Sequence, residues 1–347
     1  MSASFSIGNI EIGIGKTPLV IPDIGINHEG SLITAKKMVN AACRAGARLI
    51  KHQTHVVDDE MSHVAKSVIP GNSVDSIYDI MKRCALSEEA EWELMQYTQS
   101  KGMIFLSTPF SRSAADRLER FGVLAYKIGS GEMNNYPLLK HVAGFGKPMI
   151  VSTGMNDITS IHKAVDILEA SGVDYALMHT TNLYPTNPSL VRLSAMREMM
   201  DVFPNIPIGL SDHTLTNTAC IAAMALGASL VERHFTDTKK RPGPDVVCSM
   251  DEQALRDLVI AASDINKMFG GKKEAAKEEQ VTIDFAFATV VTIKSIKKGE
   301  KFTTDNIWVK RPGTGEIKAE KYEHILGKTA NCDIDCDIHL MQEMVEE

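Results

Sequence analysis

The sequence predicts a (β/α)8 barrel of the TIM type followed by a small β-rich C-terminal domain. Between about residues 18 and 270, short apolar runs alternate with longer stretches of helical period, giving about eight βα units in a length typical of this barrel. Several helical stretches end in glycine, as is common where a helix precedes a parallel strand. An open doubly wound sheet is the competing fold, but residues 25–30, after the first strand, lack its glycine-rich phosphate motif.

The eight predicted strands follow one another through the first 270 residues. We expect them at residues 19–26, 48–53, 103–107, 124–129, 148–152, 174–180, 206–211 and 229–235. Helical period marks the stretches between them, of which the clearest are residues 34–45, 90–101, 114–121, 158–170 and 190–202. We therefore assign residues 1–270 to one barrel domain.

The composition changes after residue 270. Residues 271–284 are rich in lysine and glutamate and are predicted to form a linker. Residues 285–347 contain short β-rich pieces separated by turn signals, beginning with a piece at residues 285–293. This last domain is too small and irregular to continue the barrel, so we expect it to depend on another surface for its stability.

The composition also excludes several classes of protein. The 347 residues carry 37 basic and 44 acidic side chains, a net charge of −7, which argues against a protein that coats nucleic acid. Six cysteines in a chain of this length do not make a disulfide scaffold. The N-terminus lacks the features of a signal peptide, and the most apolar run, at residues 220–231, is shorter than a membrane span. We expect a soluble, cytoplasmic protein with no membrane or nucleic-acid partner.

Polar residues end every predicted strand, and in this fold the active site lies at that end of the barrel. Polar groups from all eight strands would be costly to bury together without a ligand. Two lysines and four hydroxyl-bearing residues belong to this set: Lys51, Thr108, Lys127, Ser130, Ser152 and Ser211. Two point charges with neutral donors suit an oxyanion such as phosphate or carboxylate, whereas either lysine alone would be interpreted as the partner of a barrel carboxylate.

Two histidines, His213 and His234, end neighbouring strands. Neutral imidazoles side by side can hold a divalent metal and leave other positions to water and substrate, which suits an octahedral Mn²⁺ or Mg²⁺ better than closed tetrahedral zinc. The alternative is two separate histidines that act as acid or base. Spacing alone does not single out this pair, because four more histidines lie near the predicted mouth: His28, His52, His55 and His179.

The candidate carboxylates are Asp23, Glu132 and Asp245. A carboxylate beside a metal can orient or deprotonate water, and one that faces a sugar can bind its hydroxyl groups. The alternative role for each is that of a counter-ion to one of the lysines. Asp245 ends a proline- and glycine-rich loop at residues 241–245, which we expect to hold that carboxylate over the mouth.

The order of these residues resembles the sialic acid synthase family, and in particular the bacterial N-acetylneuraminate synthases. The resemblance extends over nearly the whole chain. In the barrel it rests on residues 24–31, 51–55, 59–61, 69–72, 107–110, 127–132, 152–155, 181–185, 209–213, 232–236 and 242–245. In the tail, residues 285–287 and 308–313 resemble the antifreeze-like (SAF) domain that ends those enzymes.

The resemblance implies a synthase that condenses phosphoenolpyruvate with open-chain N-acetylmannosamine, giving N-acetylneuraminate and phosphate. It implies a divalent metal on His213 and His234, with Mn²⁺ expected and Mg²⁺ or Co²⁺ as alternatives. The implied catalytic residues are Asp23, Glu132, His213 and His234. The implied ligands of phosphoenolpyruvate are Lys51, Thr108, Lys127, Ser130, Ser152, Asn182 and Ser211. The implied ligands of the sugar are Gln53, Asn72, Glu132, Tyr184, Asp245, Phe285 and Arg311.

In this family the small domain closes over the barrel of a second subunit. The resemblance therefore implies a domain-swapped homodimer in which Phe285 and Arg311 reach the sugar site of the other chain; the alternative for Arg311 is an ordinary surface arginine. One position departs from the family, which usually has glutamate where this chain has Asp23. If that carboxylate must reach metal-bound water or substrate, we expect the substitution Asp23→Glu to match or raise the rate.

Three other functions stay open at this point. The nearest is a legionaminate or pseudaminate synthase, which would use a 2,4-diacetamido-trideoxyhexose by the same mechanism, although residues 51–61 resemble the N-acetylmannosamine branch more closely. A metal-dependent aldolase would use pyruvate and release no phosphate. A non-catalytic ice-binding protein would leave the polar mouth of the barrel unexplained.

Overall fold

Eight parallel strands form a closed barrel in the computed structural model, which describes residues 4–70 and 74–346. The strands are β3 (Leu19–Gly25), β4 (Leu49–Thr54), β5 (Ile104–Pro109), β6 (Tyr126–Ile128), β7 (Met149–Ser152), β8 (Tyr175–Thr180), β9 (Ile208–Asp212) and β10 (Leu230–His234). The barrel closes where β10 pairs with β3. The predicted fold class is confirmed, and each strand overlaps the run predicted for it.

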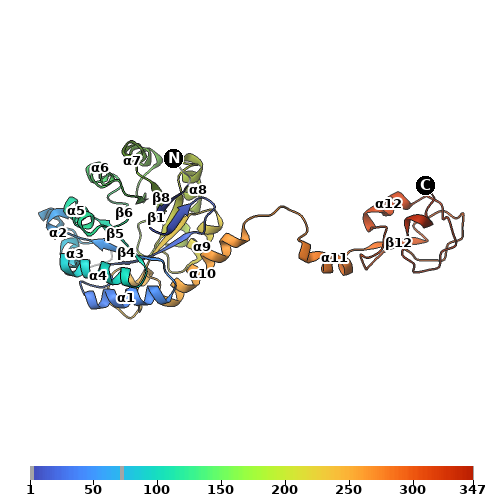
Figure 1. The fold of residues 1–347 in the computed structure, drawn as a ribbon, viewed down its shortest axis with the longest axis horizontal. Helices are drawn as coiled ribbons and strands as arrows, with labels where there is room; N and C mark the ends of the chain where they lie inside the picture. The colour runs from blue at the N-terminus through green and yellow to red at the C-terminus, as the bar shows by residue number, and fades with distance from the viewer. Residues whose placement is uncertain (1–3, 71–73, 347) are drawn as a thin grey trace. The chain divides into compact units, whose positions relative to one another are not determined.

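One long helix follows each strand and packs on the outside of the barrel (Figure 1). These helices are α1 (Leu32–Arg44), α4 (Glu88–Ser100), α5 (Arg112–Phe121), α6 (Tyr136–Ala143), α7 (Ile158–Ser171), α8 (Leu193–Val202), α9 (Thr218–Ala225) and α10 (Glu252–Met268). Their apolar faces and the outward side chains of the strands form the largest core, in which Met38 and Leu94 are fully buried. Polar side chains cap several of them; for example, Ser31 accepts a hydrogen bond from the Thr34 N–H at the start of α1.

A hairpin of β1 (Ser4–Ile7) and β2 (Ile10–Gly13) closes the N-terminal end of the barrel. Its apolar side chains pack with residues at the starts of the strands, such as Leu19 and Leu49, in a second core. Because this core fills the bottom of the barrel, a ligand cavity opens at the carboxyl ends of the strands. The sequence analysis did not predict the hairpin, whose strands have only four residues each.

Two short helices, α2 (Val57–Glu60) and α3 (Ile77–Cys84), lie in the connection between β4 and α4. The β3 loop fixes the end of α3: Gly30, with φ +74°, approaches the Arg83 carbonyl so closely that a Cβ there would collide with it. This contact holds α3 against the loops at the carboxyl end of the barrel.

The chain divides into two compact units, Met1–Phe269 and Gly270–Glu347. In the second unit, β11 (Thr289–Thr292) pairs with β12 (Ile307–Lys310) over a small apolar core that also contacts α12 (Tyr322–Ile325). The β-rich piece predicted at residues 285–293 contains β11, but its first two residues belong to α11 (Gln280–Ala286).

Within α11, the Gln280 amide donates to the Asp284 carboxylate at 2.7 Å, one helical turn apart, which stabilises the helix. Both residues lie at or before position 284, so most of α11 falls within the stretch predicted as a linker.

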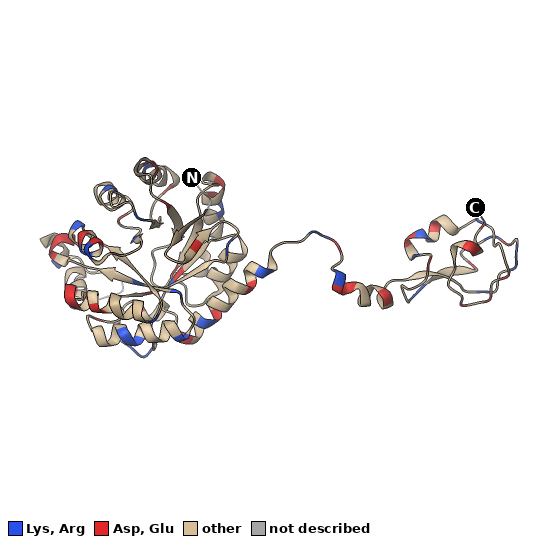
Figure 2. Cartoon of the chain, in the orientation of Figure 1, with Lys and Arg blue, Asp and Glu red and all other residues tan. Residues whose placement is uncertain are grey.

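Acidic and basic residues occur together on the outer helices of the barrel unit (Figure 2). One exposed ion pair joins Arg44 of α1 to Glu252 of α10 at 2.6 Å. Within the part of the chain that the structure describes, no helix has the length and apolar character required to cross a membrane.

Candidate active site

A cavity of about 410 Å³ opens at the carboxyl ends of the barrel strands, within the range of small-molecule sites. Its lining contains every predicted site residue of the barrel domain except Asn72, which lies outside the described residues. The predicted residues that line it are Asp23, Lys51, Gln53, Thr108, Lys127, Ser130, Glu132, Ser152, Asn182, Tyr184, Ser211, His213, His234 and Asp245. The structure therefore brings together residues that are spread over more than two hundred positions of the sequence.

Strand register explains how the acidic and basic groups meet. Asp23 is paired with His234 on one side and with Lys51 on the other. Side chains at paired positions of parallel strands lie next to one another on the same face of the sheet. The Lys51 Nζ atom lies 2.5 Å from Asp23 Oδ2, and the His234 Nδ1 atom lies 3.6 Å from the same oxygen.

The two lysines are buried and differ in pKa. Burial alone would lower the pKa of Lys51, but Asp23 and Glu232 outweigh it and raise that pKa. For Lys127 burial prevails over the attraction of Glu232 and lowers the pKa to about 8. The Lys127 ammonium donates to Ser152 Oγ at 2.5 Å and to the Ile128 carbonyl at 3.1 Å. Two buried ammonium groups in one cavity can bind an anion.

Glu232 is a cavity residue to which the sequence analysis gave no role. Its two carboxylate oxygens each lie 3.8 Å from a lysine, Oε1 from Lys51 and Oε2 from Lys127. Ser211 donates to Oε1 at 3.2 Å, whereas Oε2 is buried without a hydrogen-bond partner among the described residues. Strand alternation could have identified it, because residues two apart, such as Glu232 and His234, face the same side.

The two predicted metal ligands are neighbours in the cavity. The ring centroids of His213 and His234 are 5.4 Å apart. The His213 Nδ1–H donates to the Thr181 carbonyl at 2.8 Å, which leaves the lone pair on Nε2. Burial, followed by the nearby His234, lowers the pKa of His213 to about 3, so the imidazole is neutral. A neutral imidazole with one nitrogen fixed by a carbonyl is the usual state of a metal ligand.

The site fits a metal with an open coordination shell. The Nδ1 atom of His234 is buried and has no hydrogen-bond partner among the residues described. Across those residues, no group of three or more histidine, cysteine, aspartate or glutamate side chains is placed to hold a metal ion. His213 and His234 can supply two nitrogen ligands, and water or substrate oxygens would fill the other positions.

Glu132 is the most strongly perturbed carboxyl group at the mouth. Burial, helped by the nearby Glu60, raises its pKa to about 7. Its side chain packs against Gly129, where a Cβ would lie 2.5 Å from Glu132 Oε2. Glu132 is thus divided between its neutral and ionised forms near neutral pH, and it can donate as well as accept a hydrogen bond.

Asp23 is ionised under the same conditions. Burial alone would raise the pKa of Asp23, but the Lys51 cation outweighs it, and the pKa falls to about 2. The Gly25 N–H donates to Asp23 Oδ1 at 2.9 Å, and the Gln53 amide donates to Oδ2 at 3.2 Å. The carboxylate is therefore a fixed acceptor beside the histidine pair.

Other predicted residues lie away from this cavity. Phe285 and Arg311 belong to the second compact unit, where both side chains are exposed. The four further histidines considered above are buried near the strand ends, but they do not contribute to the cavity lining. His52 lies 3.2 Å from Glu91, and His55 lies 2.8 Å from Glu60, so these two are held by carboxylates.

An apolar side of the cavity was not predicted. Ile77, Ile80 and Met81 of α3 line it, together with Ile26 and Phe110. The spacing i, i+3, i+4 places the three α3 side chains on one face of the helix. That spacing is a helical signal that could have been recognised in the sequence.

A parallel barrel with a buried lysine pair beside two histidines at its mouth is typical of an enzyme, because such a set of side chains can bind an anion and a metal ion. The comparisons identify it further: the sequence profile of the NeuB family matches residues 38–274, and that of the SAF domain matches residues 287–346. The chain belongs to the NeuB family. It is therefore a phosphoenolpyruvate-dependent nonulosonic acid synthase, as the resemblance predicted.

Three similar proteins place the chain within this family. The N,N'-diacetyllegionaminic acid synthase of Campylobacter jejuni is 37% identical over 91% of this chain and 96% of its own. The N,N'-diacetyllegionaminic acid synthase of Legionella pneumophila is 33% identical over 96% of each chain. The crystal structure of the N-acetylneuraminic acid synthetase of Leptospira borgpetersenii, in complex with citrate, has a TM-score of 0.74 and 29% identity, covering 82% of this chain and 96% of that one.

Proposed function

We propose that this protein condenses phosphoenolpyruvate with an open-chain 2,4-diacetamido-trideoxyhexose, giving a legionaminate-type nonulosonic acid and phosphate. The observation that carries the reaction type is the single cavity in which the lysine pair, Asp23 and the two histidines meet. The choice of sugar is supported by the similarity to the two legionaminic acid synthases, which exceeds the similarity to the sialic acid synthetase. The sequence analysis favoured N-acetylmannosamine, and the comparisons favour its alternative.

The lysine pair would bind phosphoenolpyruvate. Lys51 and Lys127 supply two buried positive charges, and hydroxyl groups at Thr108 and Ser152 supply neutral donors beside them. The Thr108 hydroxyl is buried without a hydrogen-bond partner among the described residues, as expected of a group that hydrogen-bonds a bound ligand. Phosphate and carboxylate oxygens are the acceptors that such a set recognises.

In the proposed reaction, carbon 3 of phosphoenolpyruvate attacks the aldehyde carbon of the sugar, and a carbon–carbon bond forms. Water then adds to the electron-poor carbon 2, and the resulting adduct loses phosphate. Asp23, held ionised by Lys51, is placed to accept a hydrogen bond from that water and to orient it. The lysines hold the phosphate and carboxylate groups while charge shifts between them.

Members of the NeuB family are generally metal-dependent, and we propose Mn²⁺ for this protein. His213 and His234 would hold the ion. When bound there, a divalent ion supplies Lewis-acid activation of an aldehyde oxygen or of water. Mg²⁺ and Co²⁺ are the alternatives that a test must include.

The oligomeric state and the cytoplasmic location stay predictions. We propose a homodimer in which Phe285 and Arg311 of one chain serve the sugar site of the other, because the resemblance implies it and both side chains are exposed.

A phosphate-release assay tests the proposed function. Phosphoenolpyruvate is supplied with either 2,4-diacetamido-2,4,6-trideoxymannose or N-acetylmannosamine, and kcat/KM is measured for each sugar. We expect the diacetamido sugar to give the higher value. A higher value for N-acetylmannosamine would restore the first interpretation of the sequence, and turnover of pyruvate without phosphate release would contradict both.

A further inference from the structure

The cavity lining combines two kinds of side chain. Hydrogen-bonding groups come from Glu132, Asn182, Tyr184 and Asp245. Apolar groups come from one face of α3; we define the α3 wall as Ile77, Ile80 and Met81 with Ile26, which packs against Ile80. A substrate in this cavity can therefore meet hydrocarbon as well as hydrogen-bonding groups.

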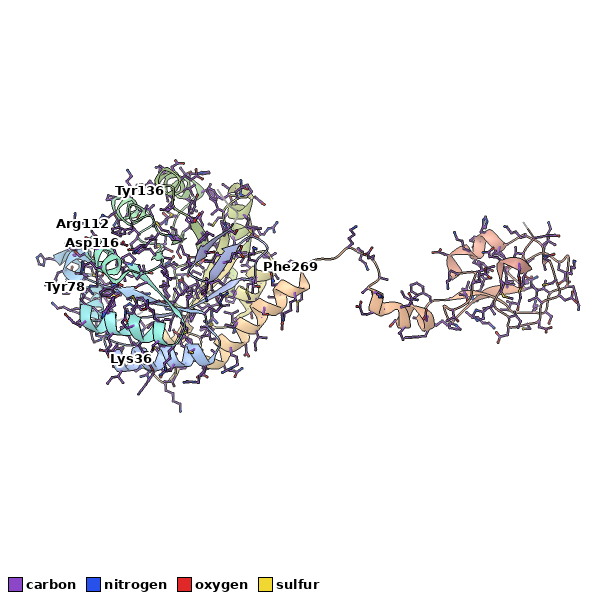
Figure 3. The ribbon with its side chains drawn as sticks, in the orientation of Figure 1. Lys36, Tyr78, Arg112, Asp116, Tyr136 and Phe269 are labelled. Carbon is purple, nitrogen blue, oxygen red and sulfur yellow. The ribbon has the colours of Figure 1, made fainter. Side chains whose placement is uncertain are left out.

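The α3 wall is held in place at both ends of the helix. At the start of α3, the Ile77 N–H donates to the Val68 carbonyl at 2.9 Å. The Tyr78 hydroxyl, labelled in Figure 3, donates to the Asp58 carboxylate at 2.6 Å and ties α3 to α2. At its end, Gly30 lies against the Arg83 carbonyl, as described above.

The wall residues differ in how deeply they are buried. Ile80 is 3% exposed and packs with Ile26 and Cys84 in a small separate core, so it anchors the helix. Ile77 and Met81 are only partly buried and line the cavity on the same helical face. These two side chains are therefore the ones placed to contact a ligand, while Ile80 supports them.

We propose that Ile77 and Met81 determine which sugar the enzyme accepts, by packing against the C6 methyl group of a 6-deoxy, diacetamido substrate. This inference rests on the proposed function. An apolar wall favours a methyl group over a hydroxymethyl group, because the hydroxyl would lose water without gaining a hydrogen bond. A discrimination of about tenfold to a hundredfold is what such a surface provides against an added hydroxyl.

The test compares four variants and the wild type on two sugars. Ile77→Asn and Met81→Gln introduce hydrogen-bonding groups into the wall, whereas Met81→Leu keeps it apolar. Val64→Gln is the matched control, because Val64 belongs to the same connection, is 69% exposed and lies outside the cavity lining. For each variant and the wild type, kcat/KM is measured with 2,4-diacetamido-2,4,6-trideoxymannose and with N-acetylmannosamine, and the KM of phosphoenolpyruvate serves as a check of the lysine site.

We expect Ile77→Asn and Met81→Gln each to move the ratio of the two kcat/KM values about tenfold toward N-acetylmannosamine, with the KM of phosphoenolpyruvate within about twofold of wild type. Met81→Leu and Val64→Gln should leave the ratio unchanged. A ratio that stays at the wild-type value in both polar variants would overturn the inference. The sugar preferred by the wild type tests the proposed function separately, since the change in ratio is measured relative to that preference.

Discussion

The Nζ atom of Lys51 lies 2.5 Å from Oδ2 of Asp23, and both side chains are buried at the mouth of the barrel. Asp23 and Lys51 are paired positions of neighbouring strands, and β3 is irregular directly after Asp23, where Gly25 adopts φ +47° and donates its N–H to Asp23 Oδ1. A Cβ at Gly25 would lie 3.2 Å from His234 Nδ1, so the glycine also makes room for the histidine. Strand pairing and this glycine together place a carboxylate beside an ammonium group and an imidazole.

This geometry changes the expectation for the substitution Asp23→Glu. The side chain of aspartate can accept a hydrogen bond from the N–H two residues later, and the longer glutamate does this less well. We now predict that Asp23→Glu lowers kcat/KM by about tenfold, equivalent to the loss of one charge-assisted hydrogen bond. Steady-state kinetics check this, and an equal or higher rate would uphold the expectation from the sequence.

The lowered pKa of Lys127 predicts that the binding of phosphoenolpyruvate depends on pH. Its pKa of about 8 means that the free enzyme loses this positive charge as the pH rises through 8. The KM of phosphoenolpyruvate should therefore increase above pH 8, approaching about tenfold per pH unit. In Lys127→Arg the charge persists, and the slope of KM against pH should flatten whatever the absolute value of KM. The same slope in both proteins would show that another group is responsible.

Glu132 predicts a pH-dependent stability. The pKa of its carboxyl group is about 7 in the folded protein and 4.5 in the unfolded chain. Between these pH values the folded protein binds more protons than the unfolded chain. The free energy of unfolding therefore falls as the pH rises from 4.5 to 7. Glu132→Gln removes this loss, which is at most about 3 kcal/mol. Thermal unfolding should show the variant to be more stable than wild type at pH 8, with a smaller difference at pH 5. Equal differences at the two pH values would disprove the assignment.

The proposed domain-swapped dimer predicts complementation between inactive chains. His213→Ala removes a barrel ligand, and Arg311→Ala removes a group of the second unit. If each site combines one barrel with the second unit of the other chain, a mixed dimer has one intact site, and random exchange restores about a quarter of wild-type activity. Subunits are exchanged and phosphate release is measured. Activity that stays at the level of the separate variants would indicate that each chain builds its own site.

Much of the barrel and its mouth could be predicted, because strand ends in a parallel barrel converge whatever loops join them. Lys51, Lys127, His213 and His234 were recognised in this way. Glu232 was given no role, because its position between two lysines depends on neighbouring strands. A single sequence does not show which of several strand-end groups will meet.

The α3 wall was missed for a different reason. The i, i+3, i+4 spacing of Ile77, Ile80 and Met81 is helical, but α3 has only eight residues, so the signal extends over little more than one turn. The contribution of α3 to the cavity depends on its docking against the β3 loop at Gly30, a tertiary contact with no local signal. Residues of the site that lie in such a connection cannot be identified from the polar residues at the strand ends.

The most direct test of the account is phosphate release by metal-stripped protein supplied with phosphoenolpyruvate and the diacetamido sugar, before and after Mn²⁺ is restored. The wild type should be inactive when stripped and should recover, releasing one phosphate for each sugar consumed. His213→Ala and His234→Ala should bind Mn²⁺ weakly in a separate titration and recover little activity. Full activity in the stripped wild type, or unimpaired Mn²⁺ binding by both variants, would contradict the paired-histidine site.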